Sequence, residues 1–143
     1  MRYRTLLVTV AAALLVAVST PALAADMAVI VHRDNANALS KSTVEKIYKG
    51  EMTTWPGGGP IIVYDLPESS DVRADFTRAL LGMTVSKLKA TWTVKLFSGK
   101  ATPPKTTGSD SEMKSVVAAN KNAIGYISAS SLDSSVKEAL TIR

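Results

Sequence analysis

The first 24 residues set how much of the chain remains to fold. Two arginines precede an uncharged apolar run that extends to about Val18, and Ala22-Leu23-Ala24 then supplies the small-x-small pattern that a signal peptidase accepts. The alternative is an uncleaved membrane anchor, but the apolar run is shorter than the roughly 20 residues that span a bilayer. We therefore expect a signal peptide over residues 1–24 and one folded domain over residues 25–143.

The composition of the expected mature domain limits its stability and its partners. The chain has no cysteine, so packing must stabilise it without disulfides. Arg2 and Arg4 account for two of the five net positive charges. The mild excess that remains suits an anionic small ligand or an acidic partner, or it only aids solubility. No basic run is interleaved with aromatic residues, so we expect no nucleic-acid binding. We expect a periplasmic or secreted protein with no membrane insertion after cleavage.

Strand-like and helix-like patterns alternate along the chain. Short β-branched runs indicate buried strands, whereas apolar residues that repeat every three or four positions indicate amphipathic helices. This alternation predicts an α/β fold, with a mixed or parallel sheet flanked by helices. The expected strands cover 27–32, 61–64, 123–127 and 136–142, the expected helices begin near 39–42, 69–71, 84 and 109, and a short helical turn is expected within 128–135.

The helix starts and faces can be assigned more closely. Ser42 has capping-box spacing to Glu45, although Ser40 is an equal alternative as N-cap. In the second helix Val72, Phe76 and Leu80 form the apolar face, and Arg73 is expected on the solvent side with Asp71, Asp75 and Arg78. In the third helix Leu88, Trp92 and Leu96 recur every four residues, which predicts that they share a buried face.

The residue types present argue against catalysis. There is no cysteine nucleophile, and His32 is the only histidine, so neither a histidine-based triad nor a multi-histidine metal site can form within one chain. Gly57-Gly58-Gly59 lacks the Lys-Ser/Thr of a phosphate-binding P-loop and is interpreted as a turn. Carboxylates near strand ends are explained equally well by solvated loop and cap positions. We expect no enzyme, no cofactor and no metal.

One helix start is a candidate binding site. Ser69 and Ser70 open a helix directly after a strand, where free N–H groups and the positive end of the helix dipole favour an anion. Arg73 adds a positive charge within one turn. The alternative is an ordinary N-cap, which Ser and Asp favour. Asp71 fits that alternative, because it would act as a cap and would repel an incoming anion.

The order of these segments resembles the phosphate-binding subunits of ABC transporters, which are type II periplasmic binding proteins. The resemblance covers about Met27 to Ile127. It implies a periplasmic-binding-protein-like lobe that binds a small anion, phosphate or another oxyanion, for an uptake system. It rests on Ile47-Tyr48-Lys49-Gly50, Thr54-Trp55 before a glycine-rich turn, the serine-led helix with Arg73 and Phe76, Trp92, and Ala123-Ile124-Gly125-Tyr126.

The chain departs from that family in length and in the ligand loop. The family has two lobes, whereas this chain is about one lobe long and resembles mainly the second. The family's phosphate loop reads Arg-x-Asp-x-Ser-Gly-Thr, and of its residues only Ser69 is retained in the matching stretch 65–71, where Asp65 and Asp71 replace the arginine and the threonine. Ser69 favours ligand binding. The two acidic residues favour the alternative, an interaction module that contacts an envelope protein. If a ligand does bind, a second chain that completes the cleft is the other expected partner.

Overall fold

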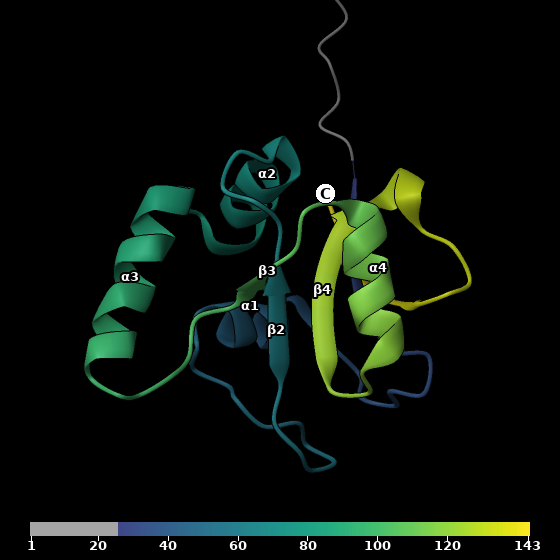
Figure 1. Ribbon diagram of the computed structural model, residues 1–143, viewed down its shortest axis with the longest axis horizontal. Helices are drawn as coiled ribbons and strands as arrows, with labels where there is room; N and C mark the ends of the chain where they lie inside the picture. Colours follow the sequence, from purple (N-terminus) through teal and green to yellow (C-terminus); the bar gives the residue numbers. More distant parts are fainter. Residues whose placement is uncertain (1–25) are drawn as a thin grey trace, which may run out of the picture.

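Five strands form one mixed sheet in the order β3-β2-β4-β1-β5, in a computed structural model that describes residues 26–143 (Figure 1). The expected signal peptide lies outside these residues. β1 is antiparallel to both of its neighbours, whereas β2 is parallel to β4 and to β3. The strands are β1 (Met27–Val31), β2 (Ile62–Asp65), β3 (Lys105–Thr106), β4 (Ala123–Ser128) and β5 (Lys137–Ile142).

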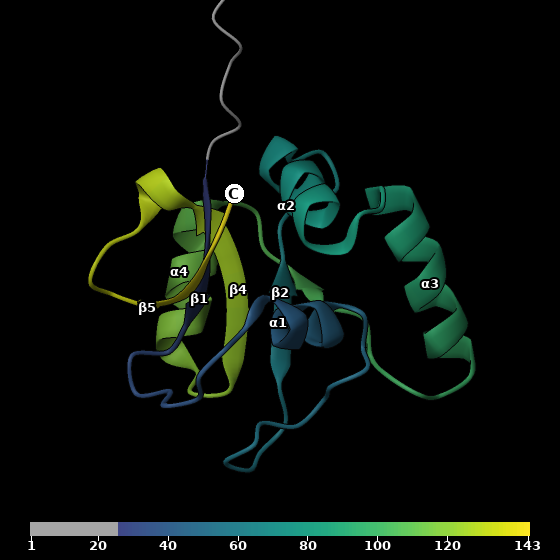
Figure 2. The same ribbon diagram turned by 180° about the vertical axis from the view of Figure 1, so that it is seen from behind.

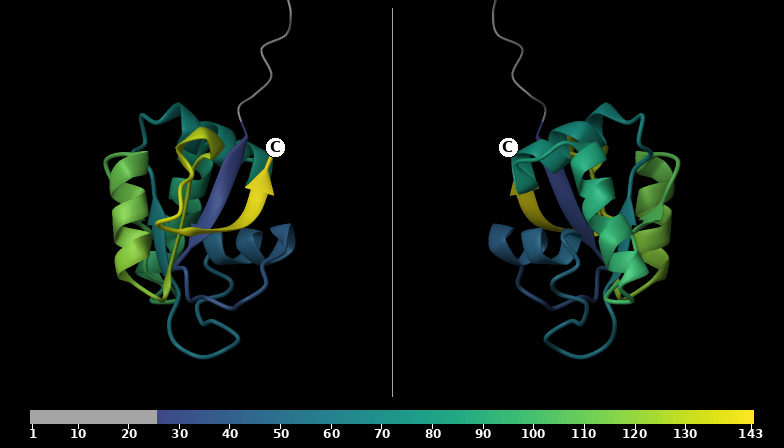
Figure 3. Two further views of the ribbon diagram at one scale, coloured as in Figure 1. Left: turned by 90° about the vertical axis from the view of Figure 1, so that its right-hand side faces the viewer. Right: turned by 90° about the vertical axis from the view of Figure 1, so that its left-hand side faces the viewer.

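Helices cover both faces of this sheet. The elements are α1 (Lys41–Tyr48), α2 (Asp71–Leu81), α3 (Val85–Phe97), α4 (Asp110–Ala119) and the 3-10 turn η1 (Ala129–Ser131). α1 and α4 lie on opposite faces (Figures 2 and 3). The inner strand β1, which has a strand on each side, is consequently buried along its whole length. The architecture confirms the expected α/β fold with a mixed sheet flanked by helices.

A side-chain cap begins each of the four α-helices, close to the helix starts that the sequence indicated. Ser70, Thr84 and Ser109 are the N-caps of α2, α3 and α4. For α1 the N-cap is Ser40 rather than Ser42, because the Ser40 hydroxyl accepts from the Thr43 N–H. Gly82 ends α2 in the left-handed conformation, with φ of 65°, which glycine adopts without steric cost.

Three expectations need correction. Arg73 was expected on the solvent side, but its exposed fraction is 9% because its guanidinium folds back onto the end of β2. Leu96 was expected to share the buried face of Trp92, but it is 52% exposed because that end of α3 extends beyond its neighbours. β2 is half-buried along most of its length rather than fully buried.

The loop after α3 also contains more order than expected. Lys105–Thr106 pairs with Tyr64 and Asp65 as the short parallel strand β3. This strand brings the chain of Pro103 and Pro104 alongside the end of β2. Among residues 26–143, no helix combines the length and apolar character needed to cross a membrane.

Candidate functional site

A buried carboxylate marks the end of β2. Asp65 is the last residue of that strand, and its Oδ1 accepts the Tyr126 hydroxyl from the neighbouring strand β4 and the Leu66 N–H at 2.9 Å. The Arg73 Nε of α2 lies 3.4 Å from the same oxygen. The end of β2, the adjacent strand β4 and the helix α2 therefore meet at the Asp65 carboxylate.

Arg73 is held in place by its backbone partner as well as by charge. Its Nη1 donates to the Leu66 carbonyl at 2.9 Å, whereas its buried Nε makes no hydrogen bond. Asp65 therefore provides charge compensation for Nε without a well-formed bond. A buried cation and a buried anion in this arrangement are costly to separate, because each would be left uncompensated.

The protonation of this cluster depends on burial. Burial raises the pKa of Asp65 above its ordinary value, and the Tyr126 hydroxyl and the Arg73 charge limit that rise. Burial also raises the pKa of Tyr126, to which the nearby Asp65 charge contributes. Tyr126 is therefore a neutral hydrogen-bond donor to the carboxylate.

Stacked aromatic rings fix the position of the Tyr126 hydroxyl. The Phe76 and Tyr126 rings are parallel to within 4°, with centroids 3.6 Å apart. Tyr48 meets both rings edge-on, and its hydroxyl donates to the Tyr64 carbonyl at 2.9 Å. The three rings come from α1, α2 and β4, so they pack both helices against the sheet on the face opposite α4, beside the charged cluster.

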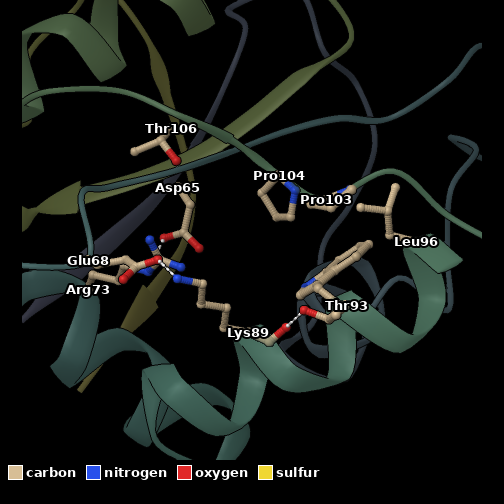
Figure 4. A pocket seen from close by; sticks show the side chains of 10 residues that line it. Asp65, Glu68, Arg73, Lys89, Thr93, Leu96, Pro103, Pro104 and Thr106 are labelled. Atoms are coloured by element: carbon tan, nitrogen blue, oxygen red, sulfur yellow. Dashed lines mark hydrogen bonds and ion pairs between the residues drawn. The ribbon is translucent and has the colours of Figure 1, made fainter.

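A pocket of about 230 Å³ opens beside this cluster, between the end of β2 and α3. Figure 4 shows charged side chains at one end of the pocket and apolar ones at the other. The lining comprises Asp65, Glu68, Arg73, Lys89, Trp92, Thr93, Leu96, Pro103, Pro104 and Thr106.

An exposed ion pair lies across the charged end of the pocket. Lys89 of α3 contacts Glu68 of the loop before α2 at 2.7 Å, and both side chains are more than half exposed. The Lys89 ammonium lowers the pKa of Glu68 through a hydrogen bond and its charge. Exposed pairs of this kind contribute little to stability. Glu68 therefore holds Lys89 only weakly.

The other side of α3 borders a second pocket, of about 290 Å³. Trp92 separates the two, and its Nε1 donates to the Tyr48 carbonyl at 3.0 Å. Lys100 is the only charged residue that lines this second pocket among the described residues. Charged groups converge only in the pocket beside Asp65, which makes it the stronger candidate.

The structure places the three residues expected at the binding site differently from one another. Arg73 lines the pocket. The Ser70 hydroxyl accepts from the Arg73 N–H as the cap of α2, and Ser69 is exposed next to it; neither serine lines the pocket. Asp71 is the first residue of α2 and not its cap, which corrects the expectation that it caps the helix.

Several pocket residues were not identified as site residues from the sequence. Lys89, Thr93 and Thr106 come from α3 and β3, and no local motif connects them with Arg73. The pairing of β3 with β2, a contact across 41 positions in the sequence, places Thr106, and the packing of α3 against α2 places Lys89 and Thr93. Within residues 26–143, no three His, Cys, Asp or Glu side chains are grouped to hold a metal ion.

Comparison with known proteins places these features in context. Residues 10–141 match the family model described as a PBP superfamily domain. No curated protein sequence matches the chain.

Solved structures resemble the chain over most of its length. An ABC-type phosphate transport receptor from Vibrio cholerae has 27% identity and a TM-score of 0.63, over 80% of this chain and 46% of that one. A putative phosphate ABC transporter substrate-binding protein from Clostridium perfringens, solved with bound phosphate, has 30% identity and a TM-score of 0.64, over 80% and 44%. PstS from Borrelia burgdorferi, at 16% identity and a TM-score of 0.55 over 73% of this chain and 42% of that one, supports the fold alone. The chain thus spans less than half the length of these proteins.

Proposed function

This chain belongs to the PBP superfamily, and we propose that it is an exported substrate-binding domain that binds a small oxyanion, such as phosphate, for an ABC-type uptake system. It has the fold of one lobe of such proteins. The observation that carries the proposal is the convergence of two cations, Arg73 in the first turn of α2 and Lys89 of α3, on one pocket.

The cations of the pocket differ in their availability to a ligand. Arg73 is buried against Asp65, so it supplies a fixed positive wall. Lys89 is held only by the exposed Glu68, and an oxyanion can replace that carboxylate at small cost. The positive end of the α2 dipole adds to the attraction. Thr93 and Thr106 line the same pocket and carry hydroxyl groups that can donate to an oxyanion.

Asp71 opposes this attraction. It is exposed in the first turn of α2, where its charge occupies the end of the dipole that an anion needs. Because Ser70 is the cap, Asp71→Thr leaves the capping bond intact, and we expect a stability change of about 1 kcal/mol or less. Phosphate binding is expected to strengthen in this variant, and Lys89→Met in the same background to weaken it again.

Calorimetric titration of the chain from Ala25 with phosphate and with sulfate tests the proposal. Lys89→Met is expected to weaken binding, whereas Lys87→Met, which removes the same charge from the same helix outside the pocket, is the matched control. Equal losses in the two variants would point to general charge attraction. If neither the wild type nor Asp71→Thr binds any oxyanion at millimolar concentration, the proposal is wrong.

The export component of the proposal has its own test. The expected cleavage follows Ala22-Leu23-Ala24, so intact-mass analysis of the secreted fraction is expected to show a chain that starts at Ala25. Recovery of only full-length chain in the membrane fraction would overturn this component and leave the ligand proposal untouched.

A second candidate function is an interaction module that uses the same lobe without a ligand. It is favoured by the internal pairing of the pocket charges, Asp65 with Arg73 and Glu68 with Lys89. Residues 82–107 carry five lysines and no acidic residue, and Phe97 within them is 86% exposed. Such a surface suits an acidic envelope protein. Absence of oxyanion binding in the titration would favour this candidate.

A further inference from the structure

The candidate pocket has two chemically distinct ends. Asp65, Glu68, Arg73 and Lys89 lie at one end, and Leu96, Pro103 and Pro104 lie at the other (Figure 4). Trp92 also lines the pocket, one turn before Leu96 on α3, and completes an apolar wall with these three residues. The pocket holds about 230 Å³, whereas by the same measure one water molecule needs only about 10–15 Å³. An inorganic oxyanion at the charged end therefore leaves the apolar end unfilled.

The side chains of the apolar wall offer nothing to an oxyanion. The two prolines have no backbone N–H, and the Leu96 side chain has no polar group. The Trp92 Nε1 is the one side-chain donor of the wall, and the Tyr48 carbonyl already accepts from it at 3.0 Å. The wall is thus suited to apolar contact alone.

This wall is also incompletely covered. Leu96 is 52% exposed, so an apolar group that packs against it removes surface from water. The two consecutive prolines restrict the backbone opposite it, which limits the entropy lost when a ligand is bound. One ligand therefore makes favourable contacts at both ends of the pocket only if it carries an anionic group and an apolar group together.

We propose that the pocket binds an organic phosphate or phosphonate in preference to inorganic phosphate, with the anionic group between Arg73 and Lys89 and the apolar substituent against the Trp92-Leu96-Pro103-Pro104 wall. The inference rests on the proposed oxyanion site and adds the class of substrate. In this proposal Leu96 and the two prolines determine specificity, and the charged end of the pocket attracts the anion.

Titration with three probes tests this assignment. Phenyl phosphate carries an apolar substituent, glycerol phosphate carries a polar one, and inorganic phosphate carries none. Phenyl phosphate is expected to bind roughly tenfold more tightly than either of the others, because only its ring covers the wall.

A matched pair of variants locates the effect. Leu96 lines the pocket, whereas Val94 lies two residues away on the same helix, is also exposed and does not line it. Leu96→Ser is expected to bring the ratio of phenyl phosphate to inorganic phosphate affinity close to one, and Val94→Ser to leave that ratio at its wild-type value.

The outcomes separate this inference from the proposed function. Binding of inorganic phosphate with no preference for phenyl phosphate would overturn the inference alone. Equal effects of Leu96→Ser and Val94→Ser on the ratio would overturn it too, because the preference would then arise outside the pocket. If no oxyanion of any kind binds, the proposed function and the inference both fail.

Discussion

Asp65 links the stability of the chain to pH, because its carboxyl group is buried at the point where β2, β4 and α2 meet. Burial raises its pKa above the ordinary value of 3.8, so the folded chain holds this proton more tightly than the unfolded chain does. The resulting stabilisation is complete below the ordinary pKa and is lost as pH rises through the raised, folded value.

Asp65→Asn isolates this contribution, because an amide oxygen can still accept from Tyr126 and Leu66 but does not titrate. We expect the wild type to lose stability relative to the variant as pH rises from about 4 through the folded pKa of Asp65. Urea unfolding of both proteins at a series of pH values measures the difference. Parallel pH profiles would show that this carboxyl group has a similar pKa in both states.

Trp92 is the second residue with a large expected effect. It is 6% exposed, and Gly50 lies so close to its ring that an added Cβ would be 2.7 Å from Trp92 Cη2. Trp92→Ala is expected to cost roughly 3–5 kcal/mol, because it opens a cavity there and leaves the Tyr48 carbonyl without its donor. Trp92→Phe keeps much of the apolar volume, so its urea midpoint is expected to lie between those of the wild type and Trp92→Ala. An unchanged midpoint in Trp92→Ala would contradict the packing of α3.

Residue-scale predictions from the sequence succeeded where the signal was local. The burial of Trp92 follows from its four-residue spacing with Leu88. The prediction that Arg73 faces solvent was wrong. Helical periodicity places it on that side, and only its distant partner Asp65 explains its burial. The prediction that Leu96 is buried was wrong for the converse reason. The apolar periodicity of α3 continues past the part of the helix that packs against the rest of the chain.

At the scale of elements, the two serines before α2 differ in role: Ser70 caps the helix, whereas Ser69 is exposed to solvent. The Ser70 hydroxyl accepts from the Arg73 N–H at 3.2 Å, whereas Ser69, one residue earlier, is exposed. Ser70→Ala is expected to lower the free energy of unfolding by about 1 kcal/mol, and Ser69→Ala to change it by much less. Chemical denaturation of the two variants measures both values, and equal losses would mean that the cap does not stabilise α2.

The elements were largely predictable because their start and stop signals lie within a few residues of each other. Ser109 and Gly82 are examples, since each acts on the backbone of its own helix. β3 was not predicted, because a strand of two residues has no periodicity and is ordered only by its pairing with β2. Pro103, Pro104 and Thr106 reach the candidate pocket through that pairing, so the pocket could not be assembled from local patterns.

At the scale of the whole molecule, the described residues form one lobe, and its pocket is lined only by that lobe. A ligand held against one wall keeps part of its surface in water. We therefore expect weak oxyanion affinity, in the millimolar range, for the chain from Ala25 by itself. The same argument predicts that a second chain covering the pocket would strengthen binding, because it would exclude that water.

Ligand-linked stability tests the whole-molecule expectation. At a phosphate concentration ten times the dissociation constant, binding to the folded state alone adds about 1.4 kcal/mol to the free energy of unfolding. Phosphate also stabilises folded proteins in general, because it is excluded from their surfaces. A comparison with Asp71→Thr separates the two effects, since exclusion acts equally on both proteins whereas site binding is stronger in the variant. Urea unfolding at matched ionic strength, with chloride as reference, is expected to show a larger phosphate increment for Asp71→Thr. Identical increments would contradict the role given to Asp71, because its charge would then have no effect on oxyanion binding.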